Sequence, residues 1–229
     1  MYQNIILIPF RNREKHLNYF IQNTIPLIEK FMPNTLIVII KQEEGKLFNR
    51  GCILNIGFKE YQNMTKYFIT HDIDINPTKD CIIKHYNKDL NNIICGILIS
   101  PCITLGGIVK ISSDNIFKMN GFPNNIWGWG AEDKALENRR VFFNIEREII
   151  FLHHKKNINN KNFICFDDVN DRNSLNHPKN YQLQYIDFKN LNTEQKKKEI
   201  FNSGLNNINY QILERKKINK ILEIIKVKI

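Results

Sequence analysis

The 229 residues contain no run of eighteen consecutive apolar residues, whereas a transmembrane helix needs about 20 predominantly apolar ones. The chain also does not open on a basic segment followed by an apolar stretch, as a secretory signal does. Its first segment, YQNIILIPF, reads as a short buried strand. The sequence therefore predicts neither a membrane span nor a signal peptide.

Cysteine is scarce as well. The number of cysteines is odd, and no two of them form a C-x-x-C pair, which argues against a disulfide framework and against a zinc site. We expect reduced, mostly buried thiols, which suit a cytoplasmic protein. The five are Cys52, Cys81, Cys95, Cys102 and Cys165.

Acidic residues are fewer than basic ones. The chain has 33 basic and 23 acidic residues, and its formal net charge is +10. A basic protein often binds anions such as nucleic acid, acidic lipid or nucleotide phosphate. Here the lysines are spread along the chain, and neither an aromatic-basic platform nor a helix-turn-helix signal is present. We therefore expect no nucleic-acid partner, and we assign most of the charge to a solvated surface.

Three short apolar segments, rich in β-branched residues, predict buried strands over residues 5–10, 35–40 and 66–70. Residues with helical spacing separate them, and a kink is expected at Pro26. This strand–helix–strand–helix–strand order predicts an α/β fold with a doubly wound, mostly parallel sheet.

The second half predicts further elements but no domain linker. Strands are expected over residues 92–100 and 147–152, and a helix over 132–143. A short helix near residue 113 would be capped by Ser113 or Asp114. Residues 155–203 are polar and predict a long irregular segment, and residues 223–229 predict a final edge strand.

A pair of carboxylates follows the third strand in HDIDINP, residues 71–77. Ligands of parallel α/β sheets gather at the carboxyl ends of the strands. Asp72 and Asp74 are two residues apart, so in an extended chain they face the same way. Paired carboxylates suit a hard divalent cation and the phosphates that it bridges, although a D-x-D pattern also occurs by chance in surface loops.

Cationic and aromatic side chains lie at two other element boundaries. Arg11 and Arg13 follow the first strand, and Arg50 opens a helix, whose N-terminus favours anions. Guanidinium groups match the geometry of a diphosphate. Together with the D-x-D pair, these boundaries predict a nucleotide-diphosphate site, whereas each alone also fits a solvated helix start.

Both tryptophans of the protein lie in one segment, GFPNNIWGWGAED, residues 121–133. Interleaved glycines would weaken a core strand, so the pattern predicts a mobile loop that covers a ligand. Glu132 and Asp133 would then meet that ligand. The alternative is that they form an acidic helix start, which is favourable to the helix dipole.

Six segments together resemble the β-1,4-galactosyltransferase family, both in their amino-acid sequences and in their order along the chain. The likeness spans nearly the whole chain, is most specific in the tryptophan segment and is weakest over residues 155–203. The segments are IPFRNREKHL, FNRGCILNIGF, HDIDINP, GGIVKIS, NGFPNNIWGWGAED and SGLNNINYQIL.

This resemblance implies a glycosyltransferase-A fold, with a mostly parallel, Rossmann-like central sheet flanked by helices. It implies transfer of galactose from UDP-galactose to a sugar hydroxyl, with inversion and with Mn²⁺ (or another divalent cation such as Mg²⁺) as cofactor. One catalytic domain would span residues 1–229. Residues 1–100 would form its nucleotide-binding half and residues 101–229 its acceptor-side half, which includes the flexible loop 121–133.

The resemblance also assigns roles to matching positions. Asp133 would be the catalytic base, with Glu132 beside it, and Asp74 and His153 would hold the metal; His154 is the alternative histidine. The donor would contact Pro9, Phe10, Arg11, Arg13, Phe48, Arg50, Asp72, Gly107 and Trp129. The acceptor would contact Trp129, Gly130, Glu132 and Asp133.

Three departures from the family pattern leave alternatives open. Thr104 stands where the family usually has tyrosine, which limits the donor's C2 substituent, so a smaller side chain could admit N-acetylgalactosamine. A related transferase of another hexose is a further alternative. Lys134 replaces a further carboxylate, and Ile150 and Phe151 cannot supply the usual second metal ligand. A catalytically weak or inactive UDP-sugar-binding module is therefore the second hypothesis.

Secretory relatives carry an N-terminal membrane anchor, a stem and disulfides. The absence of such features in this sequence favours a soluble enzyme in a reducing compartment. An excised domain of a Golgi-lumenal enzyme is the alternative.

Overall fold

The computed structural model describes residues 1–98, 104–128, 130–151, 163–165 and 177–229. For residues 98, 163–165, 177, 178 and 185 it describes the backbone only.

An eight-stranded mixed sheet forms the centre of the fold, in the order β7-β5-β6-β3-β1-β2-β10-β9. Four of the neighbouring pairs are parallel and three, β3–β6, β5–β6 and β10–β9, are antiparallel. The strands are β1 (Tyr2–Phe10), β2 (Thr35–Gln42), β3 (Thr65–His71), β5 (Ile94–Leu98), β6 (Ile108–Ser112), β7 (Arg147–Phe151), β9 (Gln211–Lys217) and β10 (Leu222–Lys228). A separate two-stranded sheet pairs β4 (Ile75–Pro77) with β8 (Phe163–Cys165).

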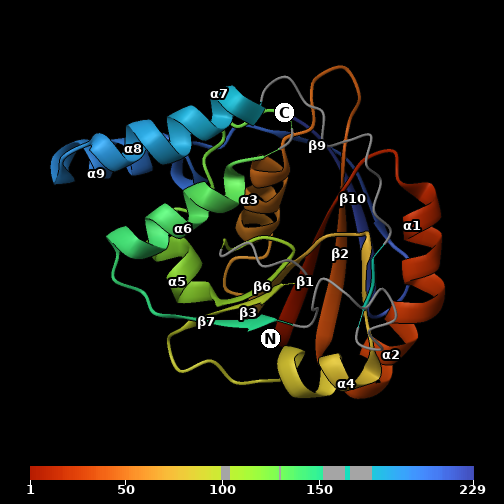
Figure 1. Cartoon of the computed structure of the whole chain (residues 1–229). Helices are drawn as coiled ribbons and strands as arrows, with labels where there is room; N and C mark the ends of the chain where they lie inside the picture. The colour runs from red at the N-terminus through yellow and green to blue at the C-terminus, as the bar shows by residue number, and fades with distance from the viewer. Residues whose placement is uncertain (99–103, 129, 152–162, 166–176) are drawn as a thin grey trace.

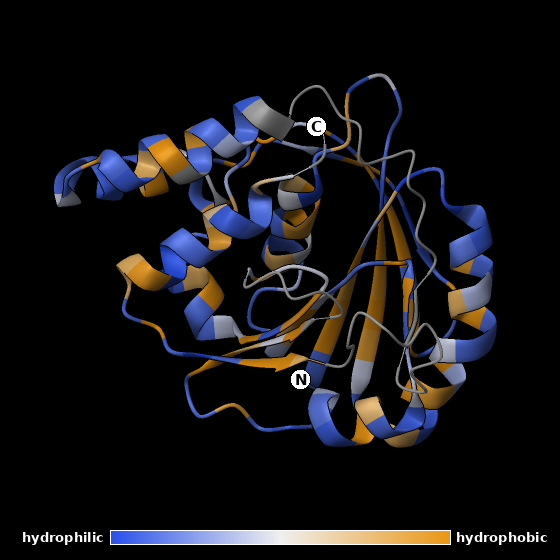
Figure 2. Cartoon of the chain, in the orientation of Figure 1, coloured by the Kyte–Doolittle hydropathy of each residue, from blue (hydrophilic) through white to orange (hydrophobic). Residues whose placement is uncertain are grey.

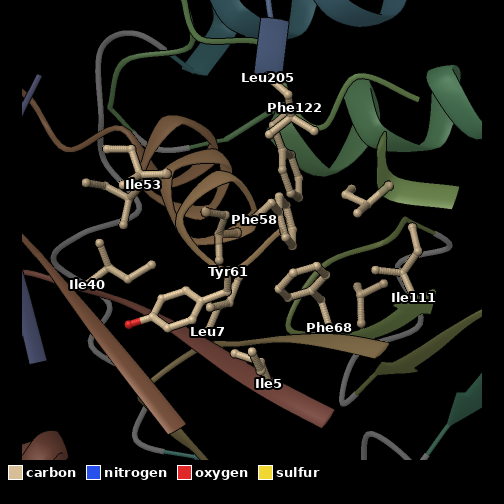
Figure 3. Close-up of a cluster of buried hydrophobic side chains, with 14 of the residues drawn as sticks. Ile5, Leu7, Ile40, Ile53, Phe58, Tyr61, Phe68, Ile111, Phe122 and Leu205 are labelled. Atoms are coloured by element: carbon tan, nitrogen blue, oxygen red, sulfur yellow. The ribbon is translucent and has the colours of Figure 1, made fainter. Parts of the chain in front are cut away.

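Alternate side chains of β1 point into two different cores, because successive residues of a strand face opposite sides of the sheet. Ile5 and Leu7 belong to one hydrophobic cluster, and Ile6 and Ile8 to the other. Figure 3 shows part of the first cluster, which packs α3 against the sheet. In Figure 2, hydrophobic residues are accordingly concentrated on the central strands. The predicted α/β class with a mostly parallel sheet is confirmed.

Helices cover both faces of the sheet (Figure 1). One face carries α1 (Glu14–Tyr19), α2 (Ile25–Phe31) and α4 (Lys79–Cys81). The other carries α3 (Arg50–Glu60), α5 (Ser113–Lys118) and α6 (Glu132–Phe142). Beyond α6 lie α7 (His177–Tyr181), α8 (Phe188–Asn190) and α9 (Thr193–Asn202). The π-helical turns are Phe20–Thr24, Ile82–Tyr86 and Gln182–Asp187, and a 3₁₀ turn spans Leu205–Asn207.

Pro26 lies in the first turn of α2, directly after the helix changes from π to α geometry between Thr24 and Ile25, and a kink there stays a prediction. Proline has no backbone N–H, so it is tolerated in the first turn of a helix, which is its position in α2. Three cysteines, Cys52, Cys81 and Cys95, are free and buried, as expected.

Three local predictions were wrong. β10 is not an edge strand, because β9 pairs with its outer side, and the charged, exposed sequence of β9 lacks an apolar alternation that would have indicated a strand. Residues 177–202 are largely helical, and Asn180, Gln184 and Phe188 form their buried face at helical spacing. The cap of α5 is Ser112, whose hydroxyl accepts a hydrogen bond from the Asn115 N–H.

The single-domain prediction for residues 1–229 stays a prediction, as do its two halves. Strands of the two halves are neighbours in one sheet, since β3 pairs with β6 and β2 with β10. No helix in the described part of the chain is both long and apolar enough to cross a membrane.

Candidate active site

The D-x-D pair lies in a tight turn at the carboxyl end of β3. The Asp72 carbonyl accepts a hydrogen bond from the Ile75 N–H at 3.1 Å, which closes the turn over residues 72–75. The Asp72 N–H donates to the Gly107 carbonyl at 3.3 Å, so the turn is also fastened to the start of β6. Both carboxylates are thus held where β3 gives way to β4.

Arg13 reaches the same edge from β1, the parallel neighbour of β3. Its guanidinium lies 3.6 Å from Asp74 Oδ2. Burial raises the pKa of Asp74 to about 6, and the charge of Asp72 adds to this rise, while Arg13 opposes it. Two neighbouring carboxylates of this kind form a site in which a further cation is favourable.

Arg50, the first residue of α3, joins the two halves of the predicted site. Its Nε donates to Asp72 Oδ1 at 2.7 Å, and its Nη1 donates to Asp133 Oδ1 at 3.2 Å. The same Nη1 lies 3.8 Å from Glu132 Oε1. The structure therefore places Asp72 of the D-x-D pair and the acidic pair of α6 around one guanidinium, as a shared site requires.

Asp133 sits in the first turn of α6, which starts after Ala131 in a left-handed conformation (φ 76°). Burial raises the pKa of the Asp133 carboxyl well above its ordinary value, and the charge of Glu132 adds to the effect. Arg50 opposes the shift. A carboxylate in this setting is a stronger base than one in water.

The backbone before β6 passes close to the Asp133 carboxylate, and two glycines there leave room for it. A Cβ on Gly106 would lie 2.8 Å from the carboxyl carbon of Asp133, closer than real Cβ contacts. Gly107 has φ +70°, a conformation that L side chains rarely adopt. The predicted donor contact Gly107 thus lies directly between the D-x-D turn and the glycine that faces Asp133.

The predicted nucleotide contacts divide into two groups. The Arg11 guanidinium lies 5.3 Å from the centre of the half-buried Phe48 ring, next to the start of α3. Pro9 and Phe10 are instead buried, and Phe10 belongs to the hydrophobic cluster under α1 and α2. The side chain of Phe10 is thus occupied by core packing, so its role as a donor contact stays a prediction.

The tryptophan segment is tied to α3 through buried asparagines. Asn55 binds the backbone of Phe122 in both directions, with its Oδ1 accepting at 2.8 Å and its Nδ2 donating at 2.7 Å. Asn49 caps α3 and donates to the Asn124 carbonyl at 2.8 Å. The Gly128 N–H donates to the Phe48 carbonyl at 2.8 Å. Closure of this segment over a ligand stays a prediction.

Sequence reasoning overlooked Asn49, Asn55 and Gly106. Asn49 was recognisable, because asparagine directly before a helical pattern is a preferred cap. Asn55 and Gly106 give no local signal, since their roles depend on residues far along the chain.

Three predicted site residues, Trp129, His153 and His154, lie outside the described residues. Gly130 is described, with φ +97°, and precedes the acidic pair by two residues. In the described ranges, no group of three or more His, Cys, Asp and Glu side chains is arranged to hold a metal ion. The role of Asp74 as a metal ligand therefore stays a prediction.

Two family models match the chain. Residues 1–87 match the N-terminal region of glycosyl transferase group 7, and residues 100–160 match the N-terminal domain of galactosyltransferase. The chain belongs to the β-1,4-galactosyltransferase family. This result confirms the family expected from the sequence. The arrangement around Arg50 is therefore that of a member of this family.

Two human relatives illustrate the extent of the match. β-1,4-Galactosyltransferase 4 is 36% identical over 141 residues, which cover 58% of this chain and 41% of that protein. β-1,4-Galactosyltransferase 1 is 29% identical over 219 residues, which cover 91% of this chain and 50% of that protein. The chain thus spans about half the length of these relatives.

A solved structure confirms the fold. The catalytic domain of Drosophila β1,4-galactosyltransferase 7, in complex with xylobiose, superposes with a TM-score of 0.75 at 22% identity. The match covers 100% of this chain and 94% of that one. The glycosyltransferase-A fold predicted for this galactosyltransferase homologue is therefore confirmed.

Proposed function

We propose that this chain is a metal-dependent, inverting glycosyltransferase that moves galactose from UDP-galactose to a sugar hydroxyl. The observation that carries the proposal is the pairing of Arg50 with Asp72 on one side and with Asp133 on the other. This pairing brings groups suited to a nucleotide diphosphate within reach of a carboxylate suited to a hydroxyl proton.

Family relatives support the donor, the cofactor and the class of acceptor. A second solved structure of the Drosophila β1,4-galactosyltransferase 7, a mutant, is a complex with manganese, UDP-Gal and xylobiose. It has a TM-score of 0.75 at 20% identity. For the present chain we accordingly propose Mn²⁺, UDP-galactose and a carbohydrate or glycoconjugate acceptor.

The residues of the D-x-D turn fit a divalent cation. Oxygen ligands suit hard cations, and Asp74 is a partly buried carboxylate whose raised pKa reflects burial and the charge of Asp72. Asp74 would bind the cation directly, and His153 is the further proposed ligand. When bound, such a cation stabilises the negative charge of a departing diphosphate.

The protein's own side chains supply the remaining chemistry. Asp133 would accept the proton of the acceptor hydroxyl while its oxygen forms a bond to the anomeric carbon. The bond from that carbon to the diphosphate oxygen breaks, and its electron pair leaves with UDP. Such general-base help is typically worth ~10²- to 10⁴-fold in rate. A single displacement of this kind inverts the anomeric centre.

The guanidinium groups have a second task at the diphosphate. Arg13 and Arg50 already face the D-x-D carboxylates, and Arg11 lies beside Phe48 at the start of α3. Guanidinium forks bind phosphate oxygens in bidentate fashion. We propose that these arginines, with Phe48 and the backbone at Gly107, hold the donor, and that Trp129 and Gly130 complete the acceptor site beside Glu132.

Thr104 motivates an alternative donor. Its side chain is buried two residues before Gly106, and the family resemblance implies that a side chain smaller than tyrosine here could admit a C2 substituent. N-acetylgalactosamine or another hexose is the alternative sugar. Turnover with UDP-galactose, UDP-N-acetylgalactosamine and UDP-glucose, compared at equal concentration, distinguishes these donors.

The decisive experiment measures UDP release and product formation with Mn²⁺, each UDP-sugar and a panel of sugar acceptors. Asp133→Asn is expected to lose at least ~10²-fold in turnover while it still binds UDP, because the lost group acts on the acceptor proton. Asp74→Ala is expected to lose Mn²⁺-dependent UDP binding as well. Asp114→Asn, an exposed carboxylate of α5, serves as the matched control and should behave as wild type.

Two results would reject the proposal in different ways. Full turnover of Asp133→Asn would remove the proposed base. Tight UDP binding by the wild type without turnover, for every donor and acceptor, would favour the alternative of an inactive UDP-sugar-binding module.

A further inference from the structure

His71 is the last residue of β3 and directly precedes the D-x-D turn, yet its ring is fully buried. It lies edge-on between two aromatic rings, with centroids 5.3 Å from Phe20 and 5.9 Å from Tyr86. A buried imidazole retains polar nitrogens, and burying them without partners is costly. A buried histidine next to the site is therefore expected to have a structural role.

One nitrogen of the ring binds the turn. Nδ1 lies 2.9 Å from the Asp72 carbonyl oxygen, which can only accept, so Nδ1 carries a proton and donates. The same oxygen accepts the Ile75 N–H at 3.1 Å. Both lone pairs of this carbonyl are therefore used, and the turn is held from inside the protein as well as along its own backbone.

The other nitrogen has a complementary neighbour. With Nδ1 protonated in the neutral ring, Nε2 is an acceptor, and it is buried without a hydrogen-bond partner among the described residues. The Tyr86 hydroxyl is a potential donor in the same state. The centres of the two rings lie 5.9 Å apart, so the two unpaired atoms belong to neighbouring side chains.

We propose that His71 is a positioning residue that fixes the Asp72–Ile75 turn and so presets Asp72 and Asp74 for a divalent cation and a nucleotide diphosphate. The proposal rests on the function proposed above. It adds a residue that contacts neither ligand and acts through the backbone carbonyl of Asp72.

Three variants separate the hydrogen bond from the packing. His71→Phe keeps an aromatic ring between Phe20 and Tyr86 but has no donor. His71→Asn places an amide near the position of Nδ1 and can restore the bond. Phe20→Leu removes a ring neighbour of His71 without touching its hydrogen bond, and it is the packing control.

Isothermal titration of the full chain with UDP in the presence of Mn²⁺ gives the first readout. Residues that orient metal ligands typically change affinity by about 10- to 100-fold, so His71→Phe should bind at least about ten-fold more weakly. His71→Asn and Phe20→Leu should stay within about three-fold of wild type by the same comparison. Wild-type affinity in His71→Phe would overturn the proposal.

Histidine ¹⁵N NMR of the wild type gives a second readout that needs no ligand. The expected result is an Nδ1-protonated ring at pH 7, assigned by the signal that His71→Phe lacks. A ring protonated only at Nε2 would overturn the proposal even if every variant binds UDP poorly.

The two readouts also separate this inference from the proposed function. A wild-type chain that binds no UDP would reject the function, and the tautomer would then decide the role of His71 on its own. A wild type that binds UDP, with His71→Phe binding equally well, would reject the role of His71 and leave the function standing.

Discussion

Arg50 lies among three carboxylates that would repel one another without its positive charge. Asp72, Glu132 and Asp133 all lie within 4 Å of its guanidinium, and its own side chain is only 11% exposed. Burial alone would lower the pKa of this guanidinium, but the three carboxylates outweigh it and raise the pKa. A lysine at this position would offer one ammonium in place of a planar fork, so it could not bind Asp72 and Asp133 with separate nitrogens.

Gly106 allows a direct test of the geometry at the proposed base. In Gly106→Ala, the new methyl group would overlap the Asp133 carboxylate, so either the carboxylate or the glycine segment must move. We expect turnover to fall by about 10²-fold, since misplacement of a catalytic group by about 1 Å has effects of that size. UDP binding should change by much less.

Gly96→Ala is the matched control, because a Cβ there would meet its nearest neighbour, Leu105, at an ordinary 3.4 Å. Steady-state kinetics and UDP titration on both variants check the prediction. Equal turnover in Gly106→Ala and wild type would mean that Asp133 is not confined as the structure indicates.

At the scale of an element, β6 connects the site to the core. Its N-terminal end follows Gly106 and Gly107, and its side chains alternate between the two hydrophobic clusters. Lys110 interrupts this pattern with a buried ammonium that donates to the Tyr86 carbonyl at 2.6 Å and lies 4.6 Å from the centre of the Tyr67 ring. The strand therefore contains a charge in the layer that also packs against His71.

Lys110 predicts a pH dependence of stability. Burial lowers its pKa from 10.5 to about 8, while Asp89 opposes the shift. The folded state thus binds this proton more weakly than the unfolded state, so stability should rise with pH between about 8 and 10.5 and be lost as pH falls through 8.

Urea unfolding of wild type and Lys110→Met at pH 7, 8, 9 and 10 measures this effect. The wild-type free energy of unfolding minus that of the variant should increase over this range by up to ~3 kcal/mol, at 1.36 kcal/mol per pKa unit. Contributions of the other titrating groups to the free energy of unfolding cancel in this difference. A difference that does not change with pH would contradict the assigned shift.

At the scale of the whole molecule, Arg139 of α6 joins segments that are distant in the sequence. Its Nη1 donates to the carbonyls of Asn120 at 2.7 Å and Gly121 at 2.9 Å, and its Nη2 donates to that of Ser203. The side chain is buried, and this burial lowers its pKa to about 9. The helix that supplies Asp133 is thereby fixed to the base of the tryptophan segment and to the SGLNN segment after α9.

Arg139→Met is expected to lower the free energy of unfolding by roughly 3 kcal/mol or more, because several buried carbonyls lose their donor. Arg215→Met, which removes surface ion pairs of β9 with Glu60 and Glu223, is the matched control and should cost at most about 1 kcal/mol. Urea unfolding of both variants at pH 7 measures their free energies of unfolding and checks this prediction. A loss in Arg139→Met no larger than in the control would show that this network is not what joins the two segments.

The sequence was informative wherever a role depends on neighbours along the chain. The order of strands and helices, the place of Asp72 and Asp74 after β3, and the start of α6 at Glu132 all agree with the structure. Predictions were wrong where tertiary contacts outweighed local pattern, as in β9, which forms a strand from charged residues because β10 offers it an edge. The same holds for α7 to α9, whose polar sequence hides a narrow buried face.

The sequence by itself determined the family, the mixed α/β class and the types of side chain at each strand end, because hydrophobic spacing and short motifs encode these features locally. Tertiary structure alone decided that Arg50 reaches Asp133, 83 residues away, that Gly106 has to lack a side chain, and that His71 turns inward to hold the Asp72 carbonyl. The physical reason is that these contacts depend on strand order and register, which bring β1, β3 and β6 side by side. Such long-range pairings are set by the packing of the whole sheet and are not contained in any short segment.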